Sequence, residues 1–397
     1  MMIRITNKEN CTGCHACVNI CPQECIFMKA DDEGFLYPYV NNNRCIDCGS
    51  CESVCPIANI AANNNKAKVY ACINKDESIR LDSSSGGIFT LIAEQILLNG
   101  GIVFGVIFNE DFSAIHSCAE TREELEKMRG SKYVQSEIGK TYRKAKDFLD
   151  EGRQVLFSGT PCQIAGLNSF LGKVYNNLFT VDIICHGVPS PAVWQEYIAY
   201  REKNAGERIK KIAFRRKDEG WKLYSLSFLF QSDKEYIQTL NKDLYMKAFL
   251  KNICLRPSCY SCEFKTLNRQ SDITLADFWG VQNIMPEMDD DKGTSLILVN
   301  STKGQDIFEK IKNEIKYKET DIGRAVTYNT SAVKSVAYNP KREKFFEELG
   351  ELSFDKLVKK YCSDSINIRV KRSTKAVIRS ALQKTGLLNV VKKSYKA

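Results

Sequence analysis

Eight cysteines near the start of the chain follow a repeated spacing that suits iron–sulfur chemistry. Each group runs C-x2-C-x2-C-x3-C-P, and the second group repeats the first 34 residues later. Three closely spaced cysteines can wrap one face of a cubane, while the fourth, at the start of a short helix, reaches the other cluster. The sequence therefore predicts two 4Fe-4S clusters with crosswise ligands. The first takes Cys11, Cys14, Cys17 and Cys55, and the second takes Cys45, Cys48, Cys51 and Cys21.

A pair of zinc sites is the alternative for these eight cysteines. Four-cysteine zinc sites use two separated C-x2-C pairs, whereas here three evenly spaced cysteines precede a C-P pair. Gly13 and Gly49 lie inside the cysteine loops, where small residues let backbone N–H groups approach sulfur atoms. Cys25 is interpreted as a buried spectator. Over residues 1 to 60 the sequence resembles the bacterial two-cluster ferredoxins, and residues 1–62 are assigned to such a domain.

Four later cysteines are candidates for a third metal site. Cys162 and Cys185 lie at the ends of predicted strands and are followed by turn residues, and Cys259 and Cys262 form a C-x2-C pair. Strand ends of an α/β sheet are where sites gather. Four thiolates could complete a third 4Fe-4S cluster, and scattered buried cysteines with a zinc knuckle are the alternative. Spacing alone does not choose between the two.

A hydroxyl-rich loop, SSSGG at Ser83 to Gly87, immediately precedes a predicted helix. Such a loop presents backbone N–H groups and the positive end of a helix dipole, which suit a phosphate or pyrophosphate. An ordinary serine N-cap is the alternative interpretation.

Short apolar segments alternate with amphipathic helices from Val69 onward, and they predict the elements that position these residues. Strands are expected at 69–74, 102–108, 155–159 and 178–185. A helix is expected to begin at the glycines after the serine run, and the polar segment 61–68 is interpreted as a linker. The predicted fold class is α/β (α+β), with an N-terminal two-cluster 4Fe-4S ferredoxin domain followed by a larger mixed-sheet domain.

Composition limits the compartment and the class of partner. Seventeen cysteines in a chain without an apolar signal or membrane segment predict a cytoplasmic protein whose thiols serve metals or catalysis. Residues 365–397 hold nine of the 57 Lys and Arg residues and none of the 48 Asp and Glu, so the rest of the chain is balanced in charge. This balance argues against nucleic acid as a partner. The basic, amphipathic tail suits a membrane surface or an acidic partner, and a solvated helix is the alternative.

The order of the motifs resembles that of the coenzyme F420 hydrogenase/dehydrogenase beta-subunit family. The motifs are GGIFTLIAEQILLNGG, GSKYVQS, GTPCQIAGL, DIICHGVPSP and CYSCEFKTLNRQSDITLADFWG. The resemblance implies an α/β core that binds FAD beside a 4Fe-4S cluster and passes a hydride between a deazaflavin and the flavin. Residues 67–360 are assigned to this flavin- and 4Fe-4S-binding domain.

The same resemblance assigns site residues. Cys162, Cys185, Cys259 and Cys262 fall on the cluster ligands of the family, with Cys254 as a rival fourth ligand. The implied flavin contacts are Ser85, Gly86, Gly87, Ser131, Lys132, Tyr133, Thr160 and Pro161. His186 and Asp277 are candidates for tuning the flavin or moving a proton, with a packed histidine and a turn or cap aspartate as the structural alternatives.

These features predict an iron–sulfur flavoprotein oxidoreductase that passes electrons between a hydride carrier and 4Fe-4S clusters through FAD. The CHGVPSP segment differs from the more acidic and aromatic continuation of the hydrogenase members, so the carrier is expected to be F420, a nicotinamide or another hydride donor. An electron-relay subunit of a larger redox complex, with no substrate site of its own, is the alternative. Either function implies a redox partner protein or a hydride-carrier coenzyme.

Overall fold

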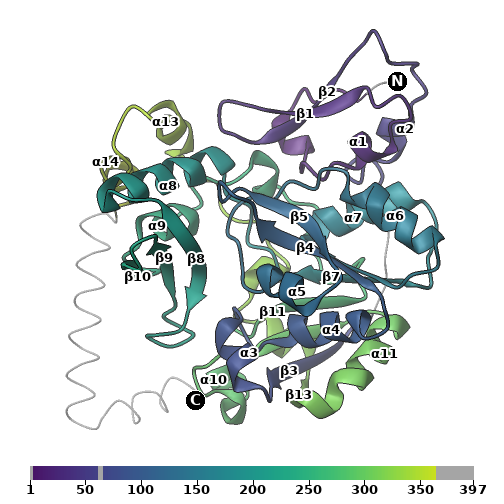
Figure 1. Cartoon of the computed structure of the whole chain (residues 1–397), viewed down its shortest axis with the longest axis vertical. Coiled ribbons are helices and arrows are strands. Elements are labelled where there is room, and N and C mark those ends of the chain that lie inside the picture. Colours follow the sequence, from purple (N-terminus) through teal and green to yellow (C-terminus); the bar gives the residue numbers. More distant parts are fainter. Residues whose placement is uncertain (1–2, 61–65, 364–397) are drawn as a thin grey trace.

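The computed structural model describes residues 3–60 and 66–363 (Figure 1). The predicted basic tail, 365–397, and most of the predicted linker lie outside the described residues. No helix in these two described ranges is long and apolar enough to cross a bilayer.

The N-terminal domain is built around its two cysteine motifs. Cys17 lies in α1 and Cys51 in α2, so each short helix carries the third cysteine of a motif and leads to the fourth. Residues in the left-handed region start both helices, with φ of 62° at His15 and 74° at Gly49. The elements are η1 (Lys8–Asn10), α1 (Ala16–Ile20), the antiparallel hairpin β1 (Ile26–Ala30) and β2 (Leu36–Val40), and α2 (Ser50–Ser53).

A mixed sheet forms the centre of the large domain. In the described part of the chain its strand order is β13-β3-β12-β11-β7-β6-β4-β5. The four central strands, β11, β7, β6 and β4, are parallel to one another. The strand pairs outside this central group, from β13 to β11 and between β4 and β5, are antiparallel. The strands are β3 (Lys68–Asn74), β4 (Ile102–Phe108), β5 (Ala114–Ala119), β6 (Val155–Gly159), β7 (Leu178–Ile183), β11 (Ile273–Asp277), β12 (Ser295–Val299) and β13 (Ile315–Thr320).

Helices cover both faces of this sheet (Figure 1). On one face α4, α5 and α11 share an apolar core with β3, β4, β6 and β12, and on the other α6 and α7 pack on β4 and β6. The helices of this layer structure are α3 (Glu77–Asp82), α4 (Ile88–Leu97), α5 (Arg122–Met128), α6 (Thr141–Asp150), α7 (Pro161–Leu171), α10 (Val281–Ile284), α11 (Thr302–Ile311) and α12 (Ile322–Val326).

A second layer of the large domain surrounds an aromatic core centred on Trp194, Tyr197, Phe228 and Tyr245. Its small antiparallel sheet has the order β10-β9-β8. The elements are α8 (Pro191–Ala205), β8 (Ile209–Arg216), β9 (Ser225–Phe230), β10 (Glu235–Thr239), α9 (Leu244–Leu250), η2 (Pro257–Cys259), α13 (Arg342–Glu347) and α14 (Phe354–Cys362).

The predicted fold class is confirmed: a mixed α/β domain follows a small cysteine-rich domain. The expected strands occur as β3, β4, β6 and β7, and the expected helix begins at Ile88, directly after Gly87. The two domains share one apolar core, because Cys14, Ala16 and Val54 pack into the cluster that contains α6 and α7. Figure 1 shows α1 and α2 (purple) beside α6 and α7.

Candidate iron–sulfur and cofactor sites

The first crosswise cysteine set lines one cavity of about 370 Å³, called here the first cavity. Its cysteines are Cys11, Cys14, Cys17 and Cys55. The loop before α1 supplies Cys11 and Cys14, and the segment after α2 supplies Cys55. Burial raises the pKa of the Cys14 thiol to about 12. The structure thus brings together the predicted set, and their role as cluster ligands remains a prediction.

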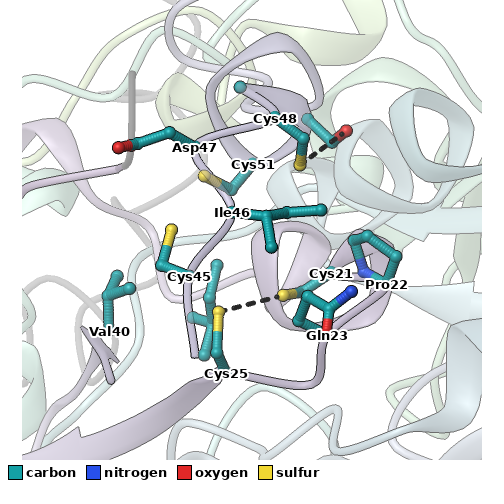
Figure 2. A pocket seen from close by; sticks show the side chains of 13 residues that line it. Cys21, Pro22, Gln23, Cys25, Val40, Cys45, Ile46, Asp47, Cys48 and Cys51 are labelled. Carbon is teal, nitrogen blue, oxygen red and sulfur yellow. Dashed lines mark hydrogen bonds between the residues drawn. The ribbon is translucent and has the colours of Figure 1, made fainter. Parts of the chain in front are cut away.

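The second crosswise set lines a separate cavity of about 350 Å³, called here the second cavity. It contains Cys21, Cys45, Cys48 and Cys51, together with Cys25. Figure 2 shows the five thiols around this space, with a dashed line joining the sulfur atoms of Cys21 and Cys25. These two sulfur atoms are 3.4 Å apart. Cys25 is therefore buried as expected, and it also lies within reach of a predicted ligand.

Replacing Cys25 with alanine is expected to leave the iron content unchanged and to lower the reduction potential of one N-terminal cluster. A thiol that donates to a ligand sulfur stabilises the more negative, reduced cluster, and hydrogen bonds to sulfur are a known determinant of potential. Redox titration followed by EPR would measure the shift. Loss of iron from the C25A variant would contradict this prediction by making Cys25 a ligand, and Cys72→Ala, at a buried thiol in β3, is the control.

The four candidate cysteines of the large domain line a cavity of about 470 Å³, called here the third cavity. They are Cys162, Cys185, Cys259 and Cys262. Cys162 follows β6 and Cys185 follows β7, and these adjacent strands are parallel, so their carboxyl ends open at the same edge of the sheet. Cys259 ends η2. Cys254 instead lies fully buried in the aromatic core and is not part of the cavity lining.

Three basic side chains share the third cavity with these thiols. They are Arg256, Lys265 and Arg269. Within the described residues, no Lys or Arg lines the first or second cavity. Four thiolates are the usual donor set of a 4Fe-4S cluster, and nearby cations offset their negative charge. The donor set of the third cavity therefore fits a cluster. In the described ranges, no three His, Cys, Asp or Glu side chains lie close enough together to hold a single metal ion.

Hydrogen-bond contacts position two of the four thiols of the third cavity. Thr160 Oγ1 lies 3.1 Å from the sulfur of Cys162, and the backbone N–H of Val188 donates to the sulfur of Cys259 at 3.4 Å. Thr160 caps α7, where its hydroxyl also donates to Gln163 Oε1. Pro161, the first residue of α7, lines the cavity. Of the predicted flavin contacts, Thr160 and Pro161 thus lie beside the cysteine site.

The predicted phosphate loop and the predicted 131–133 segment lie against each other. The backbone N–H and the hydroxyl of Ser131 both donate to Ser84 Oγ, at 2.7 and 2.9 Å. Gly86 is packed on the sheet, since a Cβ atom there would stand 2.4 Å from the carbonyl oxygen of Cys72. Its N–H donates to Ser295 Oγ. Ser85 donates to Thr294 O, and Gly87 starts α4 with φ of 80°.

Two lysines near this loop are held by backbone carbonyls. Lys132 Nζ donates to the carbonyls of Lys127, Arg129 and Gly130 at the end of α5. Lys217 Nζ donates to the carbonyls of Arg80, Ser85 and Lys292. Burial lowers the pKa of each ammonium to about 7. Lys132 is therefore a capping residue in this structure, and Lys217, which the sequence did not suggest, holds the serine loop.

A buried ion pair lies where β8, β11 and the 131–133 segment meet. Arg215 contacts Asp277 at 2.8 Å and donates to the hydroxyl of Tyr133 at 2.9 Å. Trp221 Nε1 donates to Asp277 Oδ1, and its ring stacks on Trp279 at 5.0 Å. Burial alone would lower the pKa of Arg215, but the charge of Asp277 and the Tyr133 hydroxyl outweigh it and raise the pKa. Asp277 is thus an ion-pair residue at the end of β11.

Sequence comparisons identify both domains. In the family described as "Coenzyme F420 hydrogenase/dehydrogenase, beta subunit", the N-terminal part matches residues 69–142 and the C-terminal part matches residues 152–324. The chain belongs to this family. Residues 10–59 match the "4Fe-4S dicluster domain". This member of the F420 hydrogenase/dehydrogenase beta-subunit family is therefore an iron–sulfur redox protein.

One similar solved structure comes from the F420-reducing [NiFe] hydrogenase complex of Methanosarcina barkeri. That chain is 18% identical, with a TM-score of 0.44, and the match covers 72% of this chain and 93% of that chain. A search of curated proteins gave no match.

His186 of this family member is fixed between neighbouring side chains. Its Nε2 lies 2.7 Å from Asn252 Oδ1, its Nδ1 lies 3.4 Å from Ser331 Oγ, and its ring meets Phe249 edge to face. Burial lowers its pKa despite the Asn252 contact. It follows Cys185 directly, and Lys265 donates to the carbonyls of both residues. These contacts favour a structural role at the border of the third cavity.

Proposed function

We propose that this protein is a flavin-dependent iron–sulfur oxidoreductase that moves electrons between a hydride carrier and its 4Fe-4S clusters. The observation that carries the proposal is the third cavity, in which four cysteines from three separate segments converge beside the N-terminal domain. Thr12 of that domain is part of its lining. A redox centre held there would lie between the large domain and the two N-terminal cysteine sites.

The proposed flavin site is the junction of the serine loop, the 131–133 segment, β8 and the end of β11. Ser84 and Ser131 hold the first two segments together, and Lys217, the residue after β8, ties the end of that strand to the serine loop. Arg215 connects Tyr133 with Asp277. The tyrosine and tryptophan rings at this junction suit a flat aromatic ring system.

The residues of this junction would bind and orient rather than react. Trp279, half-buried and stacked on Trp221, offers a flat apolar wall for a ring. Arg215, paired with Asp277, fixes the ends of β8 and β11 on either side of this junction. When bound, a flavin supplies the conversion between a two-electron hydride and single electrons. The donor is proposed to be a hydride carrier of the deazaflavin or nicotinamide class.

Iron, acid-labile sulfide and flavin content of the anaerobically purified protein test this proposal. We expect about twelve irons and about one flavin per chain, since three 4Fe-4S clusters would be bound. Bleaching of the flavin absorbance by reduced F420 or by a reduced nicotinamide would then identify the donor class. About eight irons and no flavin would reject the proposal and favour an electron-relay subunit with no substrate site.

A further inference from the structure

Helix α7 reaches two cysteine cavities from one of its faces. Cys162, in its first turn, lines the third cavity, and Gly166 follows four residues later. A Cβ atom on Gly166 would stand 3.0 Å from both Cβ and Sγ of Cys14, which lines the first cavity. Residues four apart share a helical face and are separated by about 6 Å along the axis. The first and third cavities are therefore about one helical turn apart at this contact.

Arg256 completes the wall between the same two cavities. It is fully buried, lines the third cavity and lies three residues before Cys259. Its Nε donates to the carbonyl oxygen of Cys11 at 2.7 Å, and its Nη2 lies 3.5 Å from the sulfur of Cys11. The guanidinium also stacks over Tyr37 at 4.3 Å. One side chain thus holds the Cys11 loop and places a permanent positive charge beside a predicted ligand.

The second cavity lies on the side of the first cavity that faces away from the third. All of its lining residues belong to the N-terminal domain, between Cys21 and Cys51. Cys48 is exposed, and 60% of Ile46 is accessible to solvent. The first cavity lies between the second and the third. It is next to the second because α1 connects Cys17 of the first cavity to Cys21 of the second, and α2 connects Cys51 of the second to Cys55 of the first.

We propose that Gly166 and Arg256 are positioning residues that couple the third cavity to the first, so that electrons cross in the order third, first, second cavity. This inference rests on the proposed function. Bound 4Fe-4S clusters supply one-electron exchange, in which one cluster loses the electron that its neighbour gains and no bond or proton moves. Arg256 additionally raises the reduction potential at the first cavity, because its charge stabilises the more negative state.

Redox titration of Arg256 variants tests the electrostatic part of the inference. In Arg256→Met, one cluster is expected to become about tenfold harder to reduce at a given potential, which corresponds to about 59 mV for a one-electron couple. Arg256→Lys keeps the charge and should restore most of this shift. The matched control is Arg342→Met, since Arg342 is also buried at the domain junction but pairs with Glu33 and the carbonyl of Leu255.

EPR of the reduced protein tests the positioning part. Gly166→Val adds a branched side chain against Cys14, which is expected to push the two domains apart at α7. The magnetic interaction that joins the first-cavity and third-cavity clusters should then weaken, while the interaction between the two N-terminal clusters stays as in the unmodified protein. Gly166→Ala, whose single added carbon meets Cys14 at 3.0 Å, should give a smaller change.

Iron content, measured first on every sample, distinguishes failure of the proposed function from failure of the roles proposed for Arg256 and Gly166. An unmodified protein with about eight irons and no flavin would reject the proposed function, and this inference with it. About twelve irons in all variants, with unshifted potentials in Arg256→Met or an equal shift in Arg342→Met, would overturn the role of Arg256 alone. Unchanged magnetic interactions in Gly166→Val would overturn the coupling through α7.

Discussion

Replacing Cys259 and Cys262 together by alanine is expected to remove about four of about twelve irons per chain, leaving the eight of the N-terminal domain. The reason is geometric. Both thiols line the third cavity, whereas the first and second cavities take all their cysteines from the N-terminal domain. Iron and sulfide assays, with EPR of the reduced protein, would measure the loss. Electron delivery from the hydride carrier to the N-terminal clusters should fall with it.

The matched control for this double variant is Cys254→Ala. Cys254 lies five residues before Cys259, but it is fully buried in the aromatic core, and burial raises its pKa well above that of a free thiol. Its removal should cost stability and leave the iron content unchanged. If Cys254→Ala lost about four irons and Cys262→Ala did not, Cys254 would replace Cys262 in the predicted ligand set.

The sequence predicted those features of the fold and the site that depend on the spacing of residues close together in the chain. The two C-x2-C-x2-C-x3-C-P motifs predicted which cysteines share a cavity, because a short loop and a short helix leave each motif little freedom. The structure places Cys55 with the first three cysteines and Cys21 with the second three. The parallel strands β6 and β7 were likewise visible as apolar segments, and with them the position of Cys162 and Cys185 at one sheet edge.

Long-range contacts could not be predicted in the same way. Arg256 contacts Cys11, which is 245 residues away in the sequence, and no local pattern around either residue predicts this contact. Gly166 was visible only as part of a motif, and its contact with Cys14 depends on how two domains pack. Lys132 was expected to face a flavin or solvent, yet it caps α5, because the carbonyls that attract it are exposed only once that helix has formed.

Asp277 shows how an ambiguous residue acquires a role from its partner. From the sequence it was a candidate for proton transfer, with a turn or cap as the alternative. In the structure it ends β11 and pairs with Arg215 of β8, whose side chain is only 4% exposed. The partner is 62 residues away, on a strand of the second layer. Only the fold reveals that the carboxylate balances a buried charge.

Replacing Asp277 with leucine is therefore expected to destabilise the protein strongly. Breaking one partner of a buried ion pair costs about 3–5 kcal/mol, because the remaining charge is left in an apolar environment. The indole N–H of Trp221 also loses its acceptor. The apparent Tm should fall by about 5 °C, measured by circular dichroism under anaerobic conditions.

The double variant Asp277→Leu with Arg215→Leu distinguishes an ion-pair role from a catalytic one. Removing both charges leaves no unpaired group, so the double variant should recover a large part of the lost Tm. The Tm of Asp277→Asn, which keeps the side-chain shape and one hydrogen bond, should lie between those of Asp277→Leu and the unmodified protein. A catalytic role predicts the opposite pattern: an Asp277→Leu protein with unchanged Tm, bound flavin and about twelve irons, but no hydride oxidation. The coupling between the two residues therefore decides whether this carboxylate holds the site or works in it.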